Sequence, residues 1–400
     1  MMKIPAADPP ATGGDGNDER GRGGALTLAL VLDSFGNQGN GTSNSALQYA
    51  QELRAQGHEV RLIGLGAPSY GARVHRIPLV SWVAAKQQMS FARADPELFR
   101  RAFAGVDLVH IYTPFAFGRA ALGQARRMGI PVTAGFHIQP ENITYSSGPI
   151  RFLPGVDSAI YQLFRHWLYG HVDHIHVPTR LTADLLRSHG YEAHLHVISN
   201  GYQARFNPGT RYDRSCRGRT FHIVASGRLA GEKDHATLIR ALSRCRHRDE
   251  ITLTIAGTGP LEHRLKAEAA ELLGEGAVSI GFHPNGNMPD LLRQADLLVH
   301  PSIADLESVS VLEGMACGAV PVIAQSDLSA AGQFALTPNS LFPARQDQVL
   351  ADRIDWWFEH PDLLDHWSRE YAEHTRTVYS VRACVRQFVG MARQAIRDYR

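Results

Sequence analysis

The sequence predicts an α/β protein made of two facing domains, each a parallel sheet covered by helices. Its 400 residues exceed what one hydrophobic core usually serves. Short apolar runs of strand length alternate with helical patterns, which is typical of parallel sheets. This alternation restarts once, after a polar segment around residues 205–219. We therefore expect a linker near residues 203–219 and a ligand-binding cleft between the two domains.

The first domain opens with an apolar run, a turn rich in glycine and asparagine, and a helical pattern, which indicates strand, loop and helix. Its predicted strands are Ala25–Leu32, His58–Leu65, Asp107–Tyr112, Pro131–Phe136 and His174–Pro178. Its predicted helices are Ser43–Gln56, Ala116–Met128 and Val156–Tyr169. Residues 1–24 lack the apolar core of a signal peptide and are expected to form a disordered leader.

The second domain repeats the alternation after the linker. Its predicted strands are Phe221–Ser226, Ile251–Gly257, Ala277–Phe282, Asp296–His300 and Ala319–Ala324. The C-terminal residues mix apolar and charged positions and predict amphipathic helices. The expected organisation is a first domain at residues 25–204, a second domain at 205–375 and a C-terminal helix at 376–400 that closes the structure.

Composition and charge narrow the class of protein. Hydrophobic residues make up 44% and charged residues 20% of the chain, as in ordinary globular proteins. Residues 70–171 hold 11 Lys and Arg against 5 Asp and Glu, so this region is basic. A basic region suits an anionic membrane surface or a phosphate-bearing acceptor, and a solvated face is the alternative. Because no interleaved nucleic-acid-binding motif is found, we expect no nucleic acid partner.

Cysteine spacing and hydropathy bear on location. The four cysteines are far apart in the sequence, without the paired spacing of a zinc site or a disulfide framework. Reduced thiols fit a cytosolic protein. No run reaches the roughly 18 apolar residues of a membrane span. The sequence therefore predicts a cytoplasmic protein whose membrane contact is peripheral, on the inner face of the plasma membrane.

The loop Asp33–Thr42 is the first chemical signal, because it carries Gly36, Gly39 and Gly41 between a strand and a helix. Glycine lets the backbone approach a ligand, and the N-terminus of the following helix presents unpaired amides to phosphate. A plain tight turn is the alternative. The spacing is not GxGxxG, which argues against a nicotinamide-dependent dehydrogenase.

Two cations follow the first strand of the second domain. Arg228 comes after Gly227, and Lys233 lies five residues beyond Arg228, where the strand gives way to a loop. Open α/β sheets bind ligands at the carboxyl ends of their strands, so this pair is placed to neutralise a diphosphate leaving group. A pair of solvent-exposed basic residues is the alternative.

The acidic segment from His300 to Val322 is the third signal. Asp305, Glu307 and Ser308 are expected at the start of a helix, and Glu313 on its body. Carboxylates suit sugar and ribose hydroxyls because each carboxylate offers several acceptor sites. The alternatives are that Asp305 and Glu307 only cap the helix and that Glu313 is a surface glutamate. Neither alternative accounts for the whole arrangement.

This segment is similar to the E-x7-E segment of the family 4 glycosyltransferases, retaining enzymes of GT-B fold with two facing Rossmann-like domains. Asp305 occupies the first acidic position, where glutamate is more usual, and Glu313 the second. Gly227, Arg228 and Lys233 resemble the phosphate clamp of the family. The resemblance implies that these residues hold a nucleotide-diphosphate sugar, expected to be a UDP-sugar, with no metal and no further cofactor.

Other segments agree with this resemblance in the expected order. Ala256–Pro260, with Gly257 and Gly259, resembles the turn on the nucleotide side, and Gly281–His283, with Phe282, resembles the strand end near the base. These residues, with Gly41, Glu307 and Ser308, are therefore expected to bind the donor. Ser199–Tyr202, with Phe206 and Pro208 after it, resembles the segment that enters the interdomain linker.

The segment Gly135–Asn142 looks most like a bacterial branch described as diacylglycerol glucosyltransferase-like. The resemblance places His137 near the donor sugar, where an imidazole can bind a hydroxyl or stabilise developing charge, whereas a structural histidine is the alternative. Glu141 is expected to orient or deprotonate an acceptor hydroxyl, with Asn142 beside it. A loop carboxylate without a role is the alternative for Glu141.

The sequence thus predicts a retaining glycosyltransferase that moves a hexose to a hydroxyl acceptor such as diacylglycerol. Polysaccharide and small-molecule acceptors, a nucleotide-sugar 2-epimerase of the same fold and a non-catalytic binding protein remain alternatives. A helical stripe with Arg151 and Arg165 nearby is typical of a membrane-interface helix, and equally of a core-packed one. The stripe consists of Val156, Ile160, Leu163, Phe164, Trp167 and Leu168.

Overall fold

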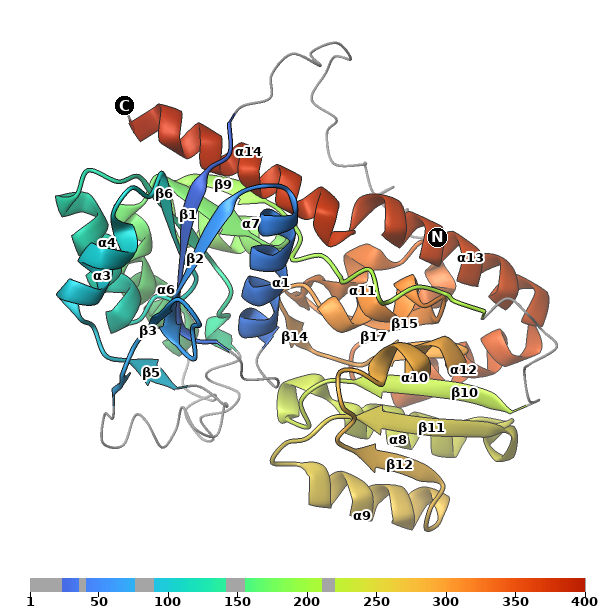
Figure 1. Ribbon diagram of the computed structural model, residues 1–400. Helices are drawn as coiled ribbons and strands as arrows, with labels where there is room; N and C mark the ends of the chain where they lie inside the picture. The colour runs from blue at the N-terminus through green and yellow to red at the C-terminus, as the bar shows by residue number, and fades with distance from the viewer. Residues whose placement is uncertain (1–23, 36–40, 76–89, 142–154, 211–219, 400) are drawn as a thin grey trace.

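The computed structural model describes residues 24–35, 41–75, 90–141, 155–210 and 220–399. It shows two α/β domains that face each other (Figure 1). The first domain has a seven-stranded sheet in the order β3-β2-β1-β6-β7-β8-β9, and the second has a six-stranded sheet in the order β12-β11-β10-β13-β15-β17. Every described pairing in these two sheets is parallel.

The strands of the first sheet are β1 (Thr27–Ser34), β2 (Glu59–Leu65), β3 (Tyr70–Gly71), β6 (Leu108–Ile111), β7 (Val132–Gly135), β8 (His174–Val177) and β9 (His194–Val197). Those of the second are β10 (Phe221–Ser226), β11 (Ile251–Ala256), β12 (Val278–Gly281), β13 (Leu297–His300), β15 (Val320–Gln325) and β17 (Leu341–Pro343). Among the described residues, two short pairs lie outside them, β4 (Val74–His75) with β5 (Phe91–Ala92), and β14 (Ala304–Asp305) with β16 (Leu328–Ser329).

Helices cover both faces of each sheet. The helices of the first half of the chain are α1 (Gly41–Ala55), α3 (Pro96–Phe103), α4 (Ala116–Arg127), α6 (Val156–Trp167), η2 (Tyr169–His171) and α7 (Arg180–Ser188). Those of the second half are η4 (Gly231–Lys233), α8 (His235–Arg244), η5 (Arg248–Glu250), α9 (Glu262–Leu273), α10 (Met288–Gln294), α11 (Val309–Ala316), η6 (Ala330–Phe334), η7 (Pro338–Ser340), α12 (Asp347–Glu359), α13 (Pro361–Val378) and α14 (Val381–Tyr399).

Strand β1 shows why its run of apolar residues is continuous. Leu28 and Leu30 belong to a buried cluster with α1 and α14, whereas Ala29 and Val31 belong to a second cluster with α3 and α4. Successive side chains of a strand point to opposite faces, so a sheet covered on both faces needs apolar residues at every position. The apolar run of the sequence is thus the signature of a doubly covered sheet.

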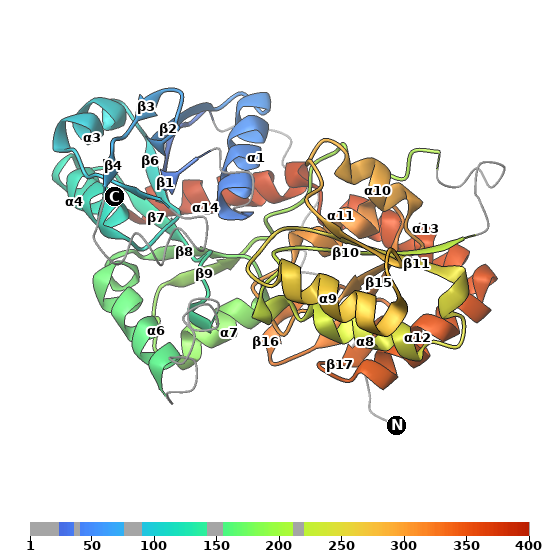
Figure 2. The ribbon, with the colours of Figure 1, turned by 90° about the horizontal axis from the view of Figure 1, so that it is seen from below.

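The two C-terminal helices connect the domains. Helix α13 packs against α11 in the second domain, and α14 packs against α1 in the first (Figures 1 and 2). The backbone N–H of Val381 donates to the carbonyl of Tyr202 (3.2 Å), and that of Tyr202 donates to the carbonyl of Tyr379 (3.3 Å). The connection between α13 and α14 is therefore bonded to the segment that leads out of the first domain.

The strands predicted for both domains are present, with ends that differ by at most two residues. Strands β3, β9 and β17 and helices α3 and α7 were not predicted from the sequence. Strand β9 is an edge strand with exposed and half-buried side chains, so it lacks an apolar run. Within the described residues, no helix is long and apolar enough to cross a membrane. Of the expected leader, only Gly24 is described.

Candidate active site

Three neighbouring strands of the second sheet end in loops that are bonded to one another. The backbone N–H of Gly227, after β10, donates to the carbonyl of Ala256 at the end of β11 (3.1 Å). In turn, the N–H of Gly257 donates to the carbonyl of Gly281 at the end of β12 (2.8 Å). The carboxyl ends of β10, β11 and β12 thus form one continuous edge, where open α/β sheets bind ligands.

Close packing of these loops explains two glycines. A Cβ atom at Gly257 would lie 1.9 Å from the carbonyl oxygen of Gly227, and one at Gly259 would lie 2.4 Å from that of Leu229. Any other residue would force the loops apart. Phe282, which follows β12 at the same edge, is 62% exposed.

Lys233, in the loop after β10, forms an ion pair with Asp305, in the segment after β13. The ammonium of Lys233, at the end of η4, donates to the carboxylate of Asp305 in β14. Nε2 of His300 lies 3.3 Å from the same carboxylate oxygen and 2.8 Å from the hydroxyl of Ser308. Burial alone would raise the pKa of Asp305, but the Lys233 ammonium and then His300 hold it below its usual range. Asp305 is therefore an anion at neutral pH.

Arg228 is held by a buried carboxylate that the sequence analysis did not identify. The guanidinium of Arg228 pairs with Glu232, whose side chain is only 3% exposed. The carbonyl of Glu232 accepts hydrogen bonds from the backbone N–H of Ile303 (2.8 Å) and the hydroxyl of Ser302 (3.1 Å). Glu232 thereby fixes the clamp loop against the segment that leads to Asp305.

His300 and His235 were also missed. Both are buried, and burial lowers the pKa of each. The pKa of His235 falls to about 3, because burial is reinforced by the Lys233 ammonium and by His300. The position of His300 could have indicated its role from the sequence, because it ends an apolar strand at the ligand-binding edge of the sheet. Both imidazoles are therefore neutral and lie within the electrostatic influence of the Lys233 ammonium.

The acidic segment differs from its predicted form at one point. Helix α11 begins at Val309, so Asp305 lies in β14 and not at the helix start. Ser308 precedes the helix with a φ of 72°, a left-handed conformation that is uncommon outside glycine. Its hydroxyl contacts His300 instead of capping the helix, because that backbone conformation turns the side chain away from the free amides.

Glu307 binds the interdomain segment. Its buried carboxylate accepts hydrogen bonds from the backbone N–H of Asn200 (3.0 and 3.1 Å) and from its side-chain Nδ2 (2.7 Å). Burial raises the pKa of Glu307 to about 7. The structure therefore shows Glu307 fastening the exit of the first domain to the second domain.

Glu313 lies half-buried on α11. Burial raises its pKa to about 7, and the guanidinium of Arg205 in the interdomain segment acts in the opposite direction. A carboxylate that titrates near neutrality is sensitive to any ligand that replaces water around it.

Segments of the first domain meet the acidic loop directly. The hydroxyl of Thr179, at the start of α7, donates to the carbonyl of Leu306 (3.0 Å). The amide Nε2 of Gln139 donates to the carbonyl of Leu328 (3.1 Å). Asp305, which lies between these contacts in the β14–β16 pair, is therefore placed where the two domains meet.

On the side of the first domain, His137 comes directly after β7 and its flanking Phe136. Its Nε2 atom is buried and has no partner among the described residues, and its ring stacks on Tyr112 with centroids 5.2 Å apart. The ring nitrogen that remains for a donor hydroxyl is therefore Nδ1. Glu141 is buried with Tyr161, whose hydroxyl lies 3.2 Å from a carboxylate oxygen, and burial raises the pKa of Glu141.

Gly41 and Asn142 are the other positions expected to bind the donor or the acceptor in the first domain. Gly41 opens α1, and the loop residues 36–40 before it lie outside the described part of the chain. Asn142 also lies outside the described residues. The structure thus brings Arg228, Lys233 and Asp305 into one site, with Glu307 at the interdomain junction.

Family models match both domains. The model described as Glycosyltransferase Family 4 matches residues 39–205, and the model described as Glycosyl transferases group 1 matches residues 216–374. Together these two models cover most of the chain, and both describe glycosyltransferases, so the chain is a glycosyltransferase. The chain belongs to the family 4 glycosyltransferases.

Several curated glycosyltransferases are similar to this chain over most of its length. A GDP-mannose-dependent alpha-mannosyltransferase of Corynebacterium glutamicum is 26% identical, over 88% of this chain and 82% of the relative. One with the same description from Mycobacterium tuberculosis is 28% identical, over 86% of this chain and 89% of the relative. The alpha-monoglucosyldiacylglycerol synthase of Streptococcus pneumoniae is 25% identical, over 76% and 71%.

Solved structures share the fold at low sequence identity. Sucrose-phosphate synthase from Thermosynechococcus elongatus has a TM-score of 0.73 at 15% identity and covers 93% of this chain and 100% of its own. Anabaena HepE in complex with UDP and glucose has a TM-score of 0.67 at 16% identity and covers 91% and 98%. The predicted fold of two facing Rossmann-like domains, GT-B, is confirmed.

Proposed function

We propose that this glycosyltransferase moves a hexose, with retention, from a nucleotide-diphosphate sugar to a lipid hydroxyl at an anionic membrane surface. The observation that supports it most is the Lys233–Asp305 pair, which stands beside Arg228 at the carboxyl edge of the second sheet and faces the first domain. A diphosphate that enters this edge meets two fixed cations, and its sugar lies between Asp305 and the first domain.

The proposed mechanism follows from charge. When the bond from sugar to diphosphate breaks, negative charge grows on the leaving group and the sugar becomes oxocarbenium-like. Arg228 and Lys233 stabilise that charge, and they need little reorganisation because Glu232 and Asp305 already hold them in place. This chain's own cations therefore carry the diphosphate charge without a bridging metal. The acceptor hydroxyl attacks from the side of the departing diphosphate, which retains the configuration.

His137 and Glu141 have unequal support in this proposal. Nδ1 of His137 can accept or donate a hydrogen bond at a donor hydroxyl, and the ring is fixed by Tyr112. Glu141 is turned toward Tyr161 of α6, so it supports the wall of the acceptor side through that contact. Burial raises its pKa, so this carboxyl holds its proton to a higher pH than an exposed glutamate does.

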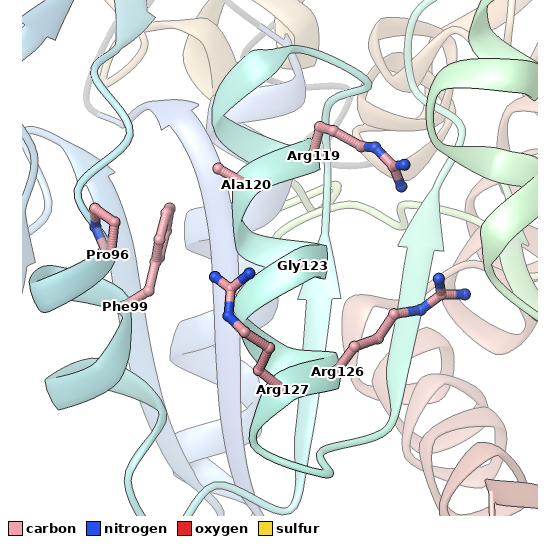
Figure 3. A pocket seen from close by; sticks show the side chains of 7 residues that line it. All are labelled: Pro96, Phe99, Arg119, Ala120, Gly123, Arg126 and Arg127. Carbon is pink, nitrogen blue, oxygen red and sulfur yellow. The ribbon is translucent and has the colours of Figure 1, made fainter.

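A basic pocket on the first domain supports an anionic surface as the place of action. A pocket of about 410 Å³ lies between α3 and α4, and Figure 3 shows Arg119, Arg126 and Arg127 around it, with Phe99 and Pro96 on the α3 side. Arg126 and Arg127 are exposed. Each cation near an anionic membrane contributes about 1 kcal/mol, so three on one helix give salt-sensitive attachment.

Helix α6 adds an apolar contribution to the same surface. Leu163 is 58% and Trp167 is 41% exposed, one helical turn apart, whereas Phe164 and Leu168 are buried in the first domain. The guanidinium of Arg126 donates to the carbonyl of His171 just beyond α6 (2.7 Å), which joins the basic and apolar parts. The relative named alpha-monoglucosyldiacylglycerol synthase makes a lipid acceptor the natural one to test first.

The donor is tested by hydrolysis, which requires no knowledge of the acceptor. The enzyme is incubated with UDP-, GDP- and ADP-sugars, and released nucleoside diphosphate is measured. We expect one nucleotide class to be hydrolysed well above the others. The sequence resemblance favours a UDP-sugar, whereas two relatives are named for GDP-mannose. The screen therefore distinguishes these two donor classes. If no donor is hydrolysed, with or without lipid, the proposed function is wrong.

The stereochemistry and acceptor are tested with the donor so found. Diacylglycerol in vesicles and a soluble sugar acceptor are compared, and the anomeric configuration of the product is determined by NMR. Transfer to the lipid with the donor's anomeric configuration supports the proposal. Transfer only to the soluble acceptor would contradict the proposal that the acceptor is a membrane lipid. A product of inverted anomeric configuration would contradict the proposed retention. Isomerised donor without transfer would instead identify a 2-epimerase.

A further inference from the structure

Three histidines converge at the carboxyl edge of the first sheet. His110 lies on β6 and His176 on β8, while His137 follows β7 between them. One ring nitrogen of each lies within 4.8 Å of the others. His110 and His176 are buried, and the Nε2 atom of half-buried His137 is inaccessible.

Hydrogen bonds fix which nitrogen of each ring faces the centre. Nε2 of His176 lies 2.7 Å from the carbonyl oxygen of Ile198, and a carbonyl only accepts, so this nitrogen carries the proton. Nδ1 of His176 is then unprotonated and presents a lone pair to the centre. Nδ1 of His110 bonds the hydroxyl of Thr133 (2.8 Å), which leaves Nε2 of His110 for the centre.

The inward nitrogens have no partner among the described residues. These atoms are Nε2 of His110, Nε2 of His137 and Nδ1 of His176. A buried polar atom without a partner costs free energy, and three around one point indicate a missing common partner.

A glycine leaves room for that partner. A Cβ atom at Gly135 would lie 2.3 Å from Nε2 of His137 and 3.2 Å from Nε2 of His110. Any side chain at this position would fill the space between the nitrogens. The buried hydroxyl of Tyr112, also without a partner among the described residues, belongs to a ring that touches both His110 (4.7 Å between centroids) and His137 (5.2 Å).

We propose that His110, His137 and His176 bind one transition-metal ion, with Zn²⁺ the best match. Three neutral imidazoles are a set that Zn²⁺ accepts, and they leave a fourth position open to water. Metal–nitrogen bonds of about 2.0–2.1 Å require the three nitrogens to lie closer together than 4.8 Å, so the rings would turn inward on metal binding. Thr133 and Ile198 hydrogen-bond the outer nitrogens of His110 and His176, and such bonds orient the rings of metal-bound histidines.

This site is separate from the residues proposed to hold the donor diphosphate, and its function goes beyond the proposed reaction. The ion would tie β6, β7 and β8 together beneath α14, whose Phe388 lies against His110 (4.9 Å between centroids). His176 bonds Ile198, and Tyr49 bonds the carbonyl of Ser199, next to the Asn200 that Glu307 holds. The ion is thus placed to stabilise the first domain and the origin of the interdomain segment.

The proposal is tested on the full chain without a histidine tag. Protein stripped with a chelator is dialysed against Zn²⁺ or Co²⁺ and then against buffer, and bound metal is measured by mass spectrometry. We expect about one equivalent per chain, a rise in Tm on metal addition, and visible absorption of tetrahedral Co²⁺. A wild-type protein that retains no metal and shows no Tm shift would overturn the proposal in favour of a buried water.

Matched variants locate the ion. His110→Gln and His176→Gln should each lose the bound metal and the metal-dependent rise in Tm. His194→Gln is the control, because His194 is exposed on β9 outside the cluster. Loss of metal in the control with retention in both cluster variants would place the ion on the surface and contradict the assignment. Should a cluster variant fail to fold, the wild-type titration still decides.

Discussion

Carboxylates at the domain junction differ because their partners differ. Asp305 faces the Lys233 ammonium, so its pKa lies below the usual range in spite of burial. Glu307 is buried against the amides of Asn200 and Glu313 is half-buried on α11, and burial raises the pKa of each to about 7. The same side-chain chemistry therefore gives one permanent anion and two groups that titrate at neutral pH.

The raised pKa of Glu313 predicts pH-dependent nucleotide binding. An ionised carboxylate accepts hydrogen bonds from both ribose hydroxyls, whereas below pH 7 the group is mostly protonated. Affinity for the nucleoside diphosphate should therefore rise about tenfold from about pH 6 to about pH 8, beyond any rise shown by Glu313→Gln. Calorimetry across this range measures it. Identical pH profiles for the two proteins, or equal affinity, would remove Glu313 from the ribose site.

Asp305 should affect the rate more than nucleotide binding. Asp305→Asn removes the anion that positions Lys233 and, in the proposed site, a donor sugar hydroxyl. Misplaced reacting groups typically slow a reaction by about 100-fold, so we expect kcat to fall by that order with nucleoside diphosphate affinity little changed. Steady-state kinetics and calorimetry separate the two. A loss confined to affinity would contradict the sugar-positioning role.

For single residues, the sequence predicts which side chains lie at the ligand-binding edge but not which side chains contact one another. Arg228, Lys233 and Asp305 are recognisable because each follows a strand at the ligand edge. Glu232 was missed because an acid four residues after an arginine is common on any surface, and only burial gives it meaning. The three-histidine cluster was missed for a related reason, since its members come from three strands whose alignment the sequence alone does not reveal.

At the element scale, central strands were predictable and edges were not. Strands β1, β10 and β15 are mostly apolar because both faces of their sheets are covered. Strand β3 has two residues and β9 is exposed, so neither carries that pattern. Helix α3 does have a start signal, with Asp95 capping two backbone amides and Pro96 in the first turn, which the sequence analysis did not use.

The apolar stripe of helix α6 packs partly on the domain core, through Phe164 and Leu168, and is partly exposed, at Leu163 and Trp167. Substitution of the two exposed residues is expected to weaken membrane binding. Leu163→Ser with Trp167→Ser removes exposed apolar groups, each worth about 1.5–3 kcal/mol when buried, so vesicle affinity should drop at least about tenfold without unfolding. Co-sedimentation with anionic vesicles at low and high salt measures it. Leu272→Ser, an exposed leucine on α9 of the second domain, is the control. Unchanged binding in the double variant, or a wild type that stays in the supernatant at low salt, would refute the membrane surface.

At the scale of the whole molecule, the last helix belongs to the core of the first domain. An amphipathic pattern shows that α14 buries one face but not against which partner, so the sequence alone did not predict this return to the start of the chain. Fixing α14 on the first domain and α13 on the second also restricts how far the domains can move apart.

Removal of the central contact of α14 should destabilise the protein. Phe388 is fully buried and touches Tyr49 and His110, so Phe388→Ala should lower the free energy of unfolding by about 3–5 kcal/mol. Tyr399→Ala, at the half-exposed end of the same helix, should change it by less than about 0.5 kcal/mol. Urea denaturation followed by circular dichroism gives both values. Equal effects of the two substitutions would show that α14 does not dock through Phe388.

Leaving-group stabilisation by Arg228 and Lys233 is tested most directly by the rate of donor hydrolysis in single variants. With the donor identified by the screen, Arg228→Met and Lys233→Met are compared with Lys266→Met, whose lysine is exposed on α9. If the two cations stabilise charge that develops only as the bond breaks, each clamp variant should lose about 100-fold or more in kcat while its circular dichroism stays native, and Lys266→Met should keep the wild-type rate. Wild-type turnover in either folded clamp variant would contradict the account.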